Sequence, residues 1–246
     1  MLFRSYPLNR LFAVNPFTQE VKELPHLFPD IDKIRVQPWD HSGLTIYDPT
    51  LQLVVYPELS SDGNVIVLWD LGKSAPVLRL QDPRLNPNPM PRWSEDGEKF
   101  VFTGLNDHPL TLIYRDGRIM NSEINLDDDI IPMDDLTSWS PDGRYLAFWV
   151  ESRGNRSGLR LMIWDTSVDR VIDTCIPSDD FIREIGYDNL PLWSPDGKYL
   201  AVKTLRAVHQ EQSLEVSEWD VEVIDFNNKL TVKVAENSIP LGWMSK

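Results

Sequence analysis

The chain has 246 residues, of which 24 are basic and 38 are acidic, so its formal net charge is −14. Nucleic-acid backbones and anionic membrane surfaces repel such a charge at long range, which argues against both as main partners. Apolar residues make up 41% of the chain, enough to form a core and too many for a disordered protein. We therefore expect a folded protein without nucleic-acid binding or membrane insertion.

The N-terminal region is predicted to form three short strands, at residues 1–6, 10–15 and 20–24. It contains Arg4 and Arg10 but no apolar run of the kind that a secretory signal needs. We therefore expect a cytoplasmic protein. A periplasmic location stays open if a signal has been removed from the chain.

One sequence motif, which we call the repeat phrase, recurs along the rest of the chain. It is complete at Trp139 and Trp193, each followed by Ser-Pro-Asp-Gly, has Glu95 in place of proline after Trp93, and is weakest at Tyr47. These aromatic residues are 46, 46 and 54 positions apart, a period typical of propellers and repeat arrays. Proline, aspartate and glycine in this order predict a tight turn between two strands.

The start of the first repeat has two candidates. Trp39 is followed by a glycine four residues later, as in the repeat phrase, and would begin the repeat eight residues earlier than Tyr47. We prefer Tyr47, because it lies 22 residues before Trp69, close to the 25 residues between Trp139 and Trp164.

A second phrase follows each turn, ending at Trp69-Asp70, Tyr114-Arg115-Asp116, Trp164-Asp165 and Ile224-Asp225. A short turn and a further β-rich run come after each one, so each repeat is predicted to form four antiparallel strands. The phrases at 139 and 193 resemble those of the TolB-type, WD-repeat-like β-propeller family of bacterial proteins. The resemblance implies a radial arrangement of four-stranded blades. It also implies that the chain acts as a partner-binding subunit, as a gating domain of a peptidase or as a sensor, the roles found among proteins with this repeat.

We predict an all-β, single-domain chain, residues 1–246, with five blades. Four blades are predicted at about 44–82, 88–125, 133–177 and 187–237. The fifth is composite: residues 238–246, with Trp243 at the repeat position, supply its first strand, and residues 1–24 supply the other three. The N-terminal strands would then pair with the C-terminal strand and close the ring.

The connections between blades are acidic, and no basic residue or histidine occurs from Glu123 to Asp142. In a propeller these connections surround one mouth of the central channel. The candidate binding residues there are Asp127, Asp128, Asp129, Asp134, Asp135, Asp179, Asp180 and Asp188.

Five positions before each repeat aromatic lie the members of a predicted polar ring, Ser42, Asn88, Asp134, Asp188 and Ser238. The ring would attract a cation, a basic peptide or a basic surface; alternatively, its members are ordinary turn residues at strand starts.

No cofactor or metal site is predicted. Asp127, Asp128 and Asp129 lack the alternating spacing and glycine of a calcium-binding loop, and the four histidines lack zinc-site spacing. Gly-x-Ser-x-Gly and glycine-rich phosphate motifs are absent from the sequence.

The sequence favours a non-catalytic interaction or scaffold propeller, as a subunit or adaptor of a larger assembly. Its acidic channel-mouth face would bind a protein partner with a basic or mixed surface. Trp219, in the longest departure from the repeat at residues 205–221, is a further candidate contact. The alternative is a carbohydrate-active, small-ligand or cation-binding propeller that uses channel carboxylates, with Asp48, Asp134 and Asp188 as first candidates.

Overall fold

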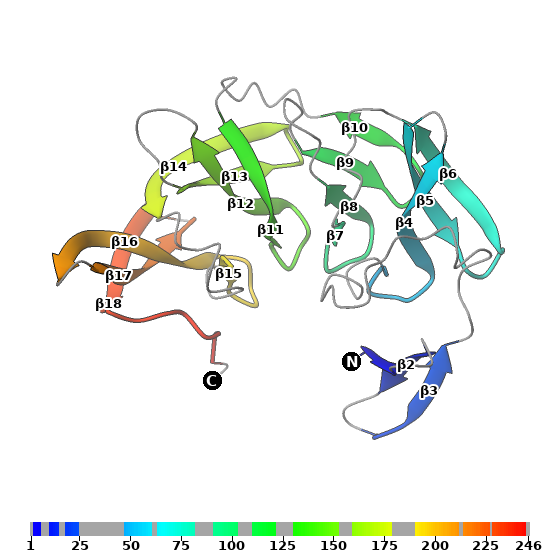
Figure 1. The fold of residues 1–246 in the computed structure, drawn as a ribbon, viewed down its shortest axis with the longest axis horizontal. Coiled ribbons are helices and arrows are strands. Elements are labelled where there is room, and N and C mark those ends of the chain that lie inside the picture. The colour runs from blue at the N-terminus through cyan, green and yellow to red at the C-terminus, as the bar shows by residue number, and fades with distance from the viewer. Residues whose placement is uncertain are drawn as a thin grey trace. The chain divides into compact units, whose positions relative to one another are not determined.

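The computed structural model describes residues 2–5, 10–14, 18–24, 47–60, 63–81, 91–102, 110–121, 130–152, 159–178, 190–211, 214–226 and 228–244. These residues form five antiparallel sheets, and none of them lies in a helix (Figure 1). The predicted all-β class is confirmed. The described part of the chain therefore contains no candidate for a membrane-spanning helix. The chain divides into two compact units, Met1–Pro83 and Arg84–Lys246.

The first unit contains two three-stranded sheets. One sheet has strands β1 (Leu2–Ser5), β2 (Arg10–Val14) and β3 (Val21–Leu24), and the other has β4 (Leu53–Ser60), β5 (Gly63–Asp70) and β6 (Ala75–Gln81). All neighbouring strands in both sheets pair antiparallel. The three N-terminal strands predicted from the sequence are therefore present and paired in chain order.

The second unit contains three four-stranded sheets, which confirms four strands in each of these repeats. The first has β7 (Arg92–Trp93), β8 (Lys99–Phe102), β9 (Thr111–Tyr114) and β10 (Ile119–Asn121). The second has β11 (Ile130–Trp139), β12 (Tyr145–Ser152), β13 (Leu159–Asp165) and β14 (Arg170–Ser178). The third has β15 (Leu192–Trp193), β16 (Tyr199–Glu211), β17 (Leu214–Asp225) and β18 (Leu230–Glu236). Strand order follows chain order in all three, so β7, β11 and β15 each lie at a sheet edge; we call them the first strands.

Serine and aspartate side chains hold the predicted turns in place. The Ser140 hydroxyl donates to Asp142 Oδ1 at 2.6 Å and accepts from the Tyr145 N–H at 2.8 Å. Gly143 takes a positive φ of 67°, and its N–H donates to the Ser140 carbonyl. The turn at Asp196 repeats this geometry, where the Ser194 hydroxyl and then the Lys198 side chain lower the pKa of Asp196 to about 2. Each turn is thus specified by residues within the phrase.

The first repeat begins at Tyr47. The Asp48 N–H donates to the Leu53 carbonyl across the same five-residue interval as the bond from Ser94 to Lys99. Leu51 occupies the place of the turn glycine and has a positive φ of 56°. The preferred start is therefore supported, whereas Trp39 lies outside the described residues.

Two apolar cores join the three sheets of the second unit. Between the β7–β10 and β11–β14 sheets, the buried residues include Val101, Leu112, Trp139, Phe148 and Trp164. Between the β11–β14 and β15–β18 sheets, they include Trp149, Leu161, Ile176, Leu200 and Val202. Both faces of the β11–β14 sheet are therefore covered, as expected for stacked blades.

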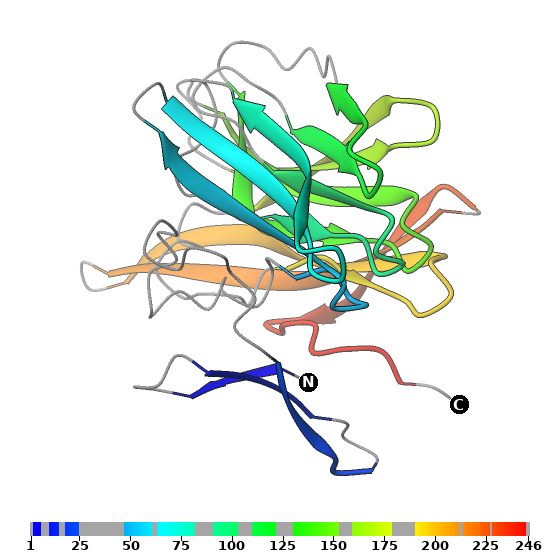
Figure 2. The same cartoon turned by 90° about the vertical axis from the view of Figure 1, so that its right-hand side faces the viewer.

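In the segment predicted as an insertion, the described residues 205–211 and 214–221 continue strands β16 and β17, which pair antiparallel and are seen lengthwise in Figure 2. At the C-terminus, residues 237–244 form no strand, so the predicted first strand of a fifth blade is not seen among the described residues. Even so, Trp243 donates its indole N–H to the Leu192 carbonyl at 2.9 Å.

Candidate functional site

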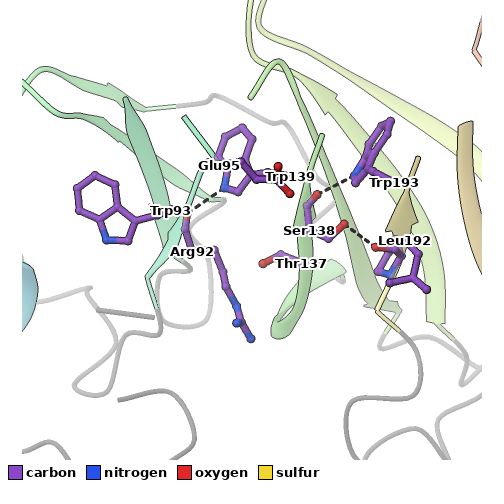
Figure 3. Close-up of a pocket in the computed structure, with 9 residues that line it drawn as sticks. Arg92, Trp93, Glu95, Thr137, Ser138, Trp139, Leu192 and Trp193 are labelled. Carbon is purple, nitrogen blue, oxygen red and sulfur yellow. Dashed lines mark hydrogen bonds between the residues drawn. The ribbon is translucent and has the colours of Figure 1, made fainter. Parts of the chain in front are cut away.

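A pocket of about 300 Å³ opens beside the three first strands of the second unit (Figure 3). Its wall consists of Arg92 and Trp93 from β7, Thr137, Ser138 and Trp139 from β11, and Leu192 and Trp193 from β15, together with Glu95 and Pro191. Since first strands line the axis of a propeller, this pocket lies on the side where the sequence predicts the channel.

Tryptophan side chains connect neighbouring first strands along this wall. Trp139 Nε1 donates to the Arg92 carbonyl at 2.9 Å, and Trp193 Nε1 donates to the Ser138 carbonyl at 3.1 Å. Trp243 makes the equivalent bond to Leu192. Each of these tryptophans thus binds the residue that precedes the aromatic of the repeat before it. The Ser138 hydroxyl adds a bond to the Pro191 carbonyl at 2.6 Å.

Thr137 is the unusual polar residue of the pocket. It is 5% exposed, and its Oγ1 atom has no hydrogen-bond partner among the described residues. Figure 3 shows the hydroxyl directed toward the Arg92 side chain on the neighbouring first strand. A buried hydroxyl without a partner costs about 1–3 kcal/mol, so its retention calls for a physical explanation.

A second polar group lies between the same two sheets, at the end where the repeat turns are found. Lys99 Nζ donates to Thr166 Oγ1 at 2.9 Å and lies 5.4 Å from the centre of the Trp139 ring. Burial lowers the pKa of Lys99, while Asp96, Asp142 and Asp165 act in the opposite direction. Between the next two sheets, Tyr145 and Phe226 occupy the equivalent positions and pack against Trp193. The lysine position therefore serves packing between blades.

An ion pair with several supporting hydrogen bonds joins Arg144 to Asp165. The guanidinium donates to Asp165 Oδ2 at 2.6 Å, and this bond is the largest cause that lowers the pKa of Asp165. Ser167 donates to the same carboxylate from its N–H and its hydroxyl. The pair ties the β12 and β13 ends together and is a structural contact.

Trp219 belongs to a charged cluster on β16, β17 and β18. Lys203 Nζ lies 3.9 Å from the centre of the Trp219 ring. Arg206 forms ion pairs with Glu218, Asp220 and Glu236 from the neighbouring strands. Trp219 is half-buried, so the ring predicted as a partner contact is engaged within the sheet by Lys203.

Most of the predicted site residues are not covered by the structure. Ser42, Asn88, Asp127, Asp128, Asp129, Asp179, Asp180 and Asp188 lie outside the described residues. Asp134 and Asp135 are described only as backbone of β11, within a register irregularity between Pro132 and Thr137. Ser238 is half-buried and donates to the Glu236 carbonyl at 2.8 Å. The polar ring is therefore still a prediction.

Asp48, a candidate acid in the alternative interpretation, is buried at a turn. Its carboxylate accepts bonds from the N–H groups of Thr50, Gln52 and Leu53 and from the Thr50 hydroxyl. These contacts assign it a structural role in the turn. Among the residues with described side chains, no group of three or more histidine, cysteine, aspartate or glutamate residues could hold a metal ion.

Two acidic segments adjoin the same end of the β11–β14 sheet. They are residues 122–129 and 179–189, and we call them the acidic connections. Ile130 of β11 pairs with Ser152 of β12, and Leu159 of β13 pairs with Ser178 of β14. Glu151 pairs with Leu159, so all four strand ends lie at one end of the sheet. The first acidic connection enters β11 at this end, and the second leaves β14 there.

Arg92 and Thr137 are not among the site residues predicted from the sequence. Both lie one or two positions before a repeat tryptophan. Aligning the repeats at that position sets Thr137 against Pro91 and Pro191, and Arg92 against Ser138 and Leu192. Variation in polarity at otherwise matched positions is a signal that could have drawn attention to them.

The chain is similar in structure to oligogalacturonate lyase from Vibrio parahaemolyticus, with a TM-score of 0.55 and 12% identity over 92% of this chain and 60% of the other. It is also similar to TolB from Acinetobacter baumannii, with a TM-score of 0.50 and 13% identity over 97% of this chain and 52% of the other. A third match is an oligogalacturonate lyase in complex with manganese, at a TM-score of 0.53 and 13% identity over 96% and 64% of the two chains.

The structural neighbours are TolB-type and other β-propeller proteins. The fold is of the β-propeller type. At this level of identity the likeness concerns the fold alone, and the chain spans about half to two thirds of the length of these neighbours. No family model and no curated protein matches the sequence.

Proposed function

We propose that this chain is a non-catalytic β-propeller that binds a protein partner through its acidic connections. The observation that carries the proposal is the register of the β11–β14 sheet, which attaches both acidic connections to one end of that sheet. The connections contain Asp127, Asp128, Asp129, Asp179, Asp180 and Asp188, and β11 carries Asp134 and Asp135 near its middle.

Electrostatics favours a partner with a basic or mixed surface. Like charges attached to one end of a sheet raise the local negative potential, and a complementary positive surface then associates faster and more selectively. β-Propellers host both binding proteins and enzymes, so the fold alone does not select a function. In this chain, Asp48, Asp165 and Asp196 all accept turn hydrogen bonds, which favours binding over catalysis by these described carboxylates.

Neutralising the first acidic connection tests the proposal. The variant Asp127→Asn/Asp128→Asn/Asp129→Asn is expected to bind decalysine about five- to thirtyfold more weakly, at ~0.3–0.7 kcal/mol for each exposed charge removed. Isothermal titration calorimetry at low ionic strength measures the change. Raising the salt concentration should weaken binding by the parent chain, because salt screens exposed charges.

A matched variant neutralises three acids at the end of the β7–β10 sheet where its repeat turn lies. This variant is Glu95→Gln/Glu98→Gln/Asp116→Asn. These residues lie in or beside the turns that follow β7 and β9. The variant has the same net charge as the first and should bind decalysine nearly as well as the parent chain. Equal losses in both variants would mean that net charge alone attracts the peptide, which contradicts a local binding face.

We further propose that the ring has five blades and closes through a composite blade. Three observations support it. β1, β2 and β3 form a sheet one strand short of the four-stranded repeat, and Trp243 makes the bond expected of a repeat tryptophan. The exposed side chains of Leu230 and Val232 also leave one face of β18 for a further blade to cover.

Intramolecular cross-linking tests this closure. In a Cys175→Ser background, Leu2→Cys with Met244→Cys should react with a short dithiol cross-linker to give a cross-linked monomer, detected by mass spectrometry. Val168→Cys with Met244→Cys should give none, since Val168 lies in the outer turn between β13 and β14. Links between separate molecules alone would contradict closure within one chain.

The pocket between the first strands favours a second candidate function, the binding of a small ligand. Its volume of about 300 Å³ lies at the lower end of the range for ligand pockets. The cytoplasmic location expected from the sequence remains a prediction.

A further inference from the structure

We propose that the pocket between β7, β11 and β15 binds a carboxylate group carried on a small apolar body. This site is separate from the acidic connections, so each can exist without the other. Its wall has two properties that such a ligand needs, which are hydrogen-bond donors and apolar surface.

Three carbonyls of the wall each accept a hydrogen bond from the protein. The carbonyls of Arg92, Ser138 and Pro191 accept bonds from Trp139, Trp193 and the Ser138 hydroxyl at 2.6–3.1 Å. The Thr137 hydroxyl of the same wall has no such partner among the described residues, so it can donate to a ligand that offers an acceptor.

The donors of the wall are Thr137 and Arg92. The Thr137 hydroxyl is buried and has no partner among the described residues, so a ligand oxygen would satisfy it. Arg92 lines the same pocket, on the side toward which that hydroxyl points (Figure 3). A guanidinium has five N–H donors and can bind an anion while it keeps other contacts. An ionised carboxylate only accepts hydrogen bonds, and it binds a guanidinium and a hydroxyl together.

Charge limits the anion to a single negative charge. Glu95 also lines the pocket, and the chain as a whole has a formal net charge of −14. Both oppose a doubly charged phosphate more strongly than a carboxylate. The rest of the wall is apolar, because Pro191, Leu192 and Trp193 supply carbon surface, and this accommodates the body of the ligand.

Titration of the full chain with benzoate tests the site, with benzamide as the uncharged control. We expect benzoate to bind and benzamide to bind at least tenfold more weakly, as measured by protein-observed NMR. Thr137→Val should weaken benzoate binding at least tenfold, and Thr137→Ser, which restores the hydroxyl, should recover it. Arg92→Gln should cause a similar loss, whereas Arg118→Gln, in the exposed turn before β10, should cause none.

Thermal unfolding separates loss of the site from loss of the fold. Valine has the shape of threonine without the unpartnered hydroxyl, so Thr137→Val should unfold at the same temperature as the parent chain or higher.

A tetrapeptide with a free C-terminal carboxylate, compared with its C-terminal amide, identifies the kind of molecule that carries the bound carboxylate. Binding of the peptide acid without binding of benzoate assigns the site to chain termini, and binding of both assigns it to carboxylates in general. Equal binding of acids and amides, absence of any binding, or unchanged binding by Thr137→Val would overturn the proposal.

Discussion

Replacing Trp139 by alanine should cost about 3–5 kcal/mol of unfolding free energy, the usual range for removing a buried large aromatic side chain. The ring is 6% exposed and packs in the core between the β7–β10 and β11–β14 sheets. Its loss would leave a cavity there and would also leave the Arg92 carbonyl without its indole donor. Urea denaturation followed by far-UV circular dichroism measures the change.

Trp243→Ala is the matched control for this experiment. Trp243 makes the equivalent indole bond at 2.9 Å, to Leu192, but the residue is 37% exposed. Its removal should cost about 1 kcal/mol, close to the value of one hydrogen bond and a partly buried ring. If the two variants lost equal stability, the bond rather than the packing of the core would account for the effect.

Gly143→Ala should lower stability by about 2–5 kcal/mol, from two additive causes. The glycine has a φ of 67°, a conformation that costs an alanine about 1–2 kcal/mol. A Cβ atom here would also lie 2.9 Å from Asp96 Oδ2 of the preceding repeat turn. Asp96 Oδ1 accepts from the Ser94 hydroxyl and the Glu98 N–H, so the carboxylate cannot move without losing turn bonds. Overpacking of this kind costs about 1–3 kcal/mol.

Gly197→Ala separates the two causes. Gly197 occupies the same turn position with a φ of 68°, but a Cβ atom there would meet only Pro141 Cδ, at an ordinary 3.8 Å. We expect a loss of about 1–2 kcal/mol, from the backbone alone. Differential scanning calorimetry of both variants compares the losses. Equal losses in the two variants would show that Asp96 adapts to the added Cβ without cost. The double variant Asp96→Ala/Gly143→Ala would confirm the contact between this Cβ and Asp96 if it recovered part of the difference in stability between the two glycine variants.

Features that depend on neighbouring residues in the chain were predictable. The turn at Ser140 is held by Asp142, Gly143 and Tyr145, all within the recurring phrase. The three N-terminal strands and the four-stranded units were predictable in the same way. The alternation of apolar residues indicates the strands, and the turn residues indicate where each strand ends. The start at Tyr47 was also predictable, since Asp48 replaces the repeat serine and makes the same backbone bond.

Features that depend on contacts between repeats were not predictable. Trp149 lies outside both repeated aromatic positions, yet it is fully buried between two sheets. In the segment that departs most from the repeat phrase, the described residues 205–211 and 214–221 lengthen the paired strands β16 and β17. Strand pairing tolerates such an extension, whereas a comparison of repeat phrases treats it as an insertion. Trp219 in that hairpin is covered by Lys203 from the neighbouring strand.

Short-range patterns in the chain were enough to predict the β-class, the repeat, the turns and the strands, because hydrogen bonds and alternation within a few residues specify each of them. Only the tertiary structure showed that Arg92 and Thr137, 45 residues apart in the chain, lie in one pocket wall. The tryptophan bonds between Trp139, Arg92, Trp193 and Ser138 bring these strands together. Packing between repeats therefore decides which polar groups meet, and a hydroxyl without a partner is recognisable only after its neighbours are known.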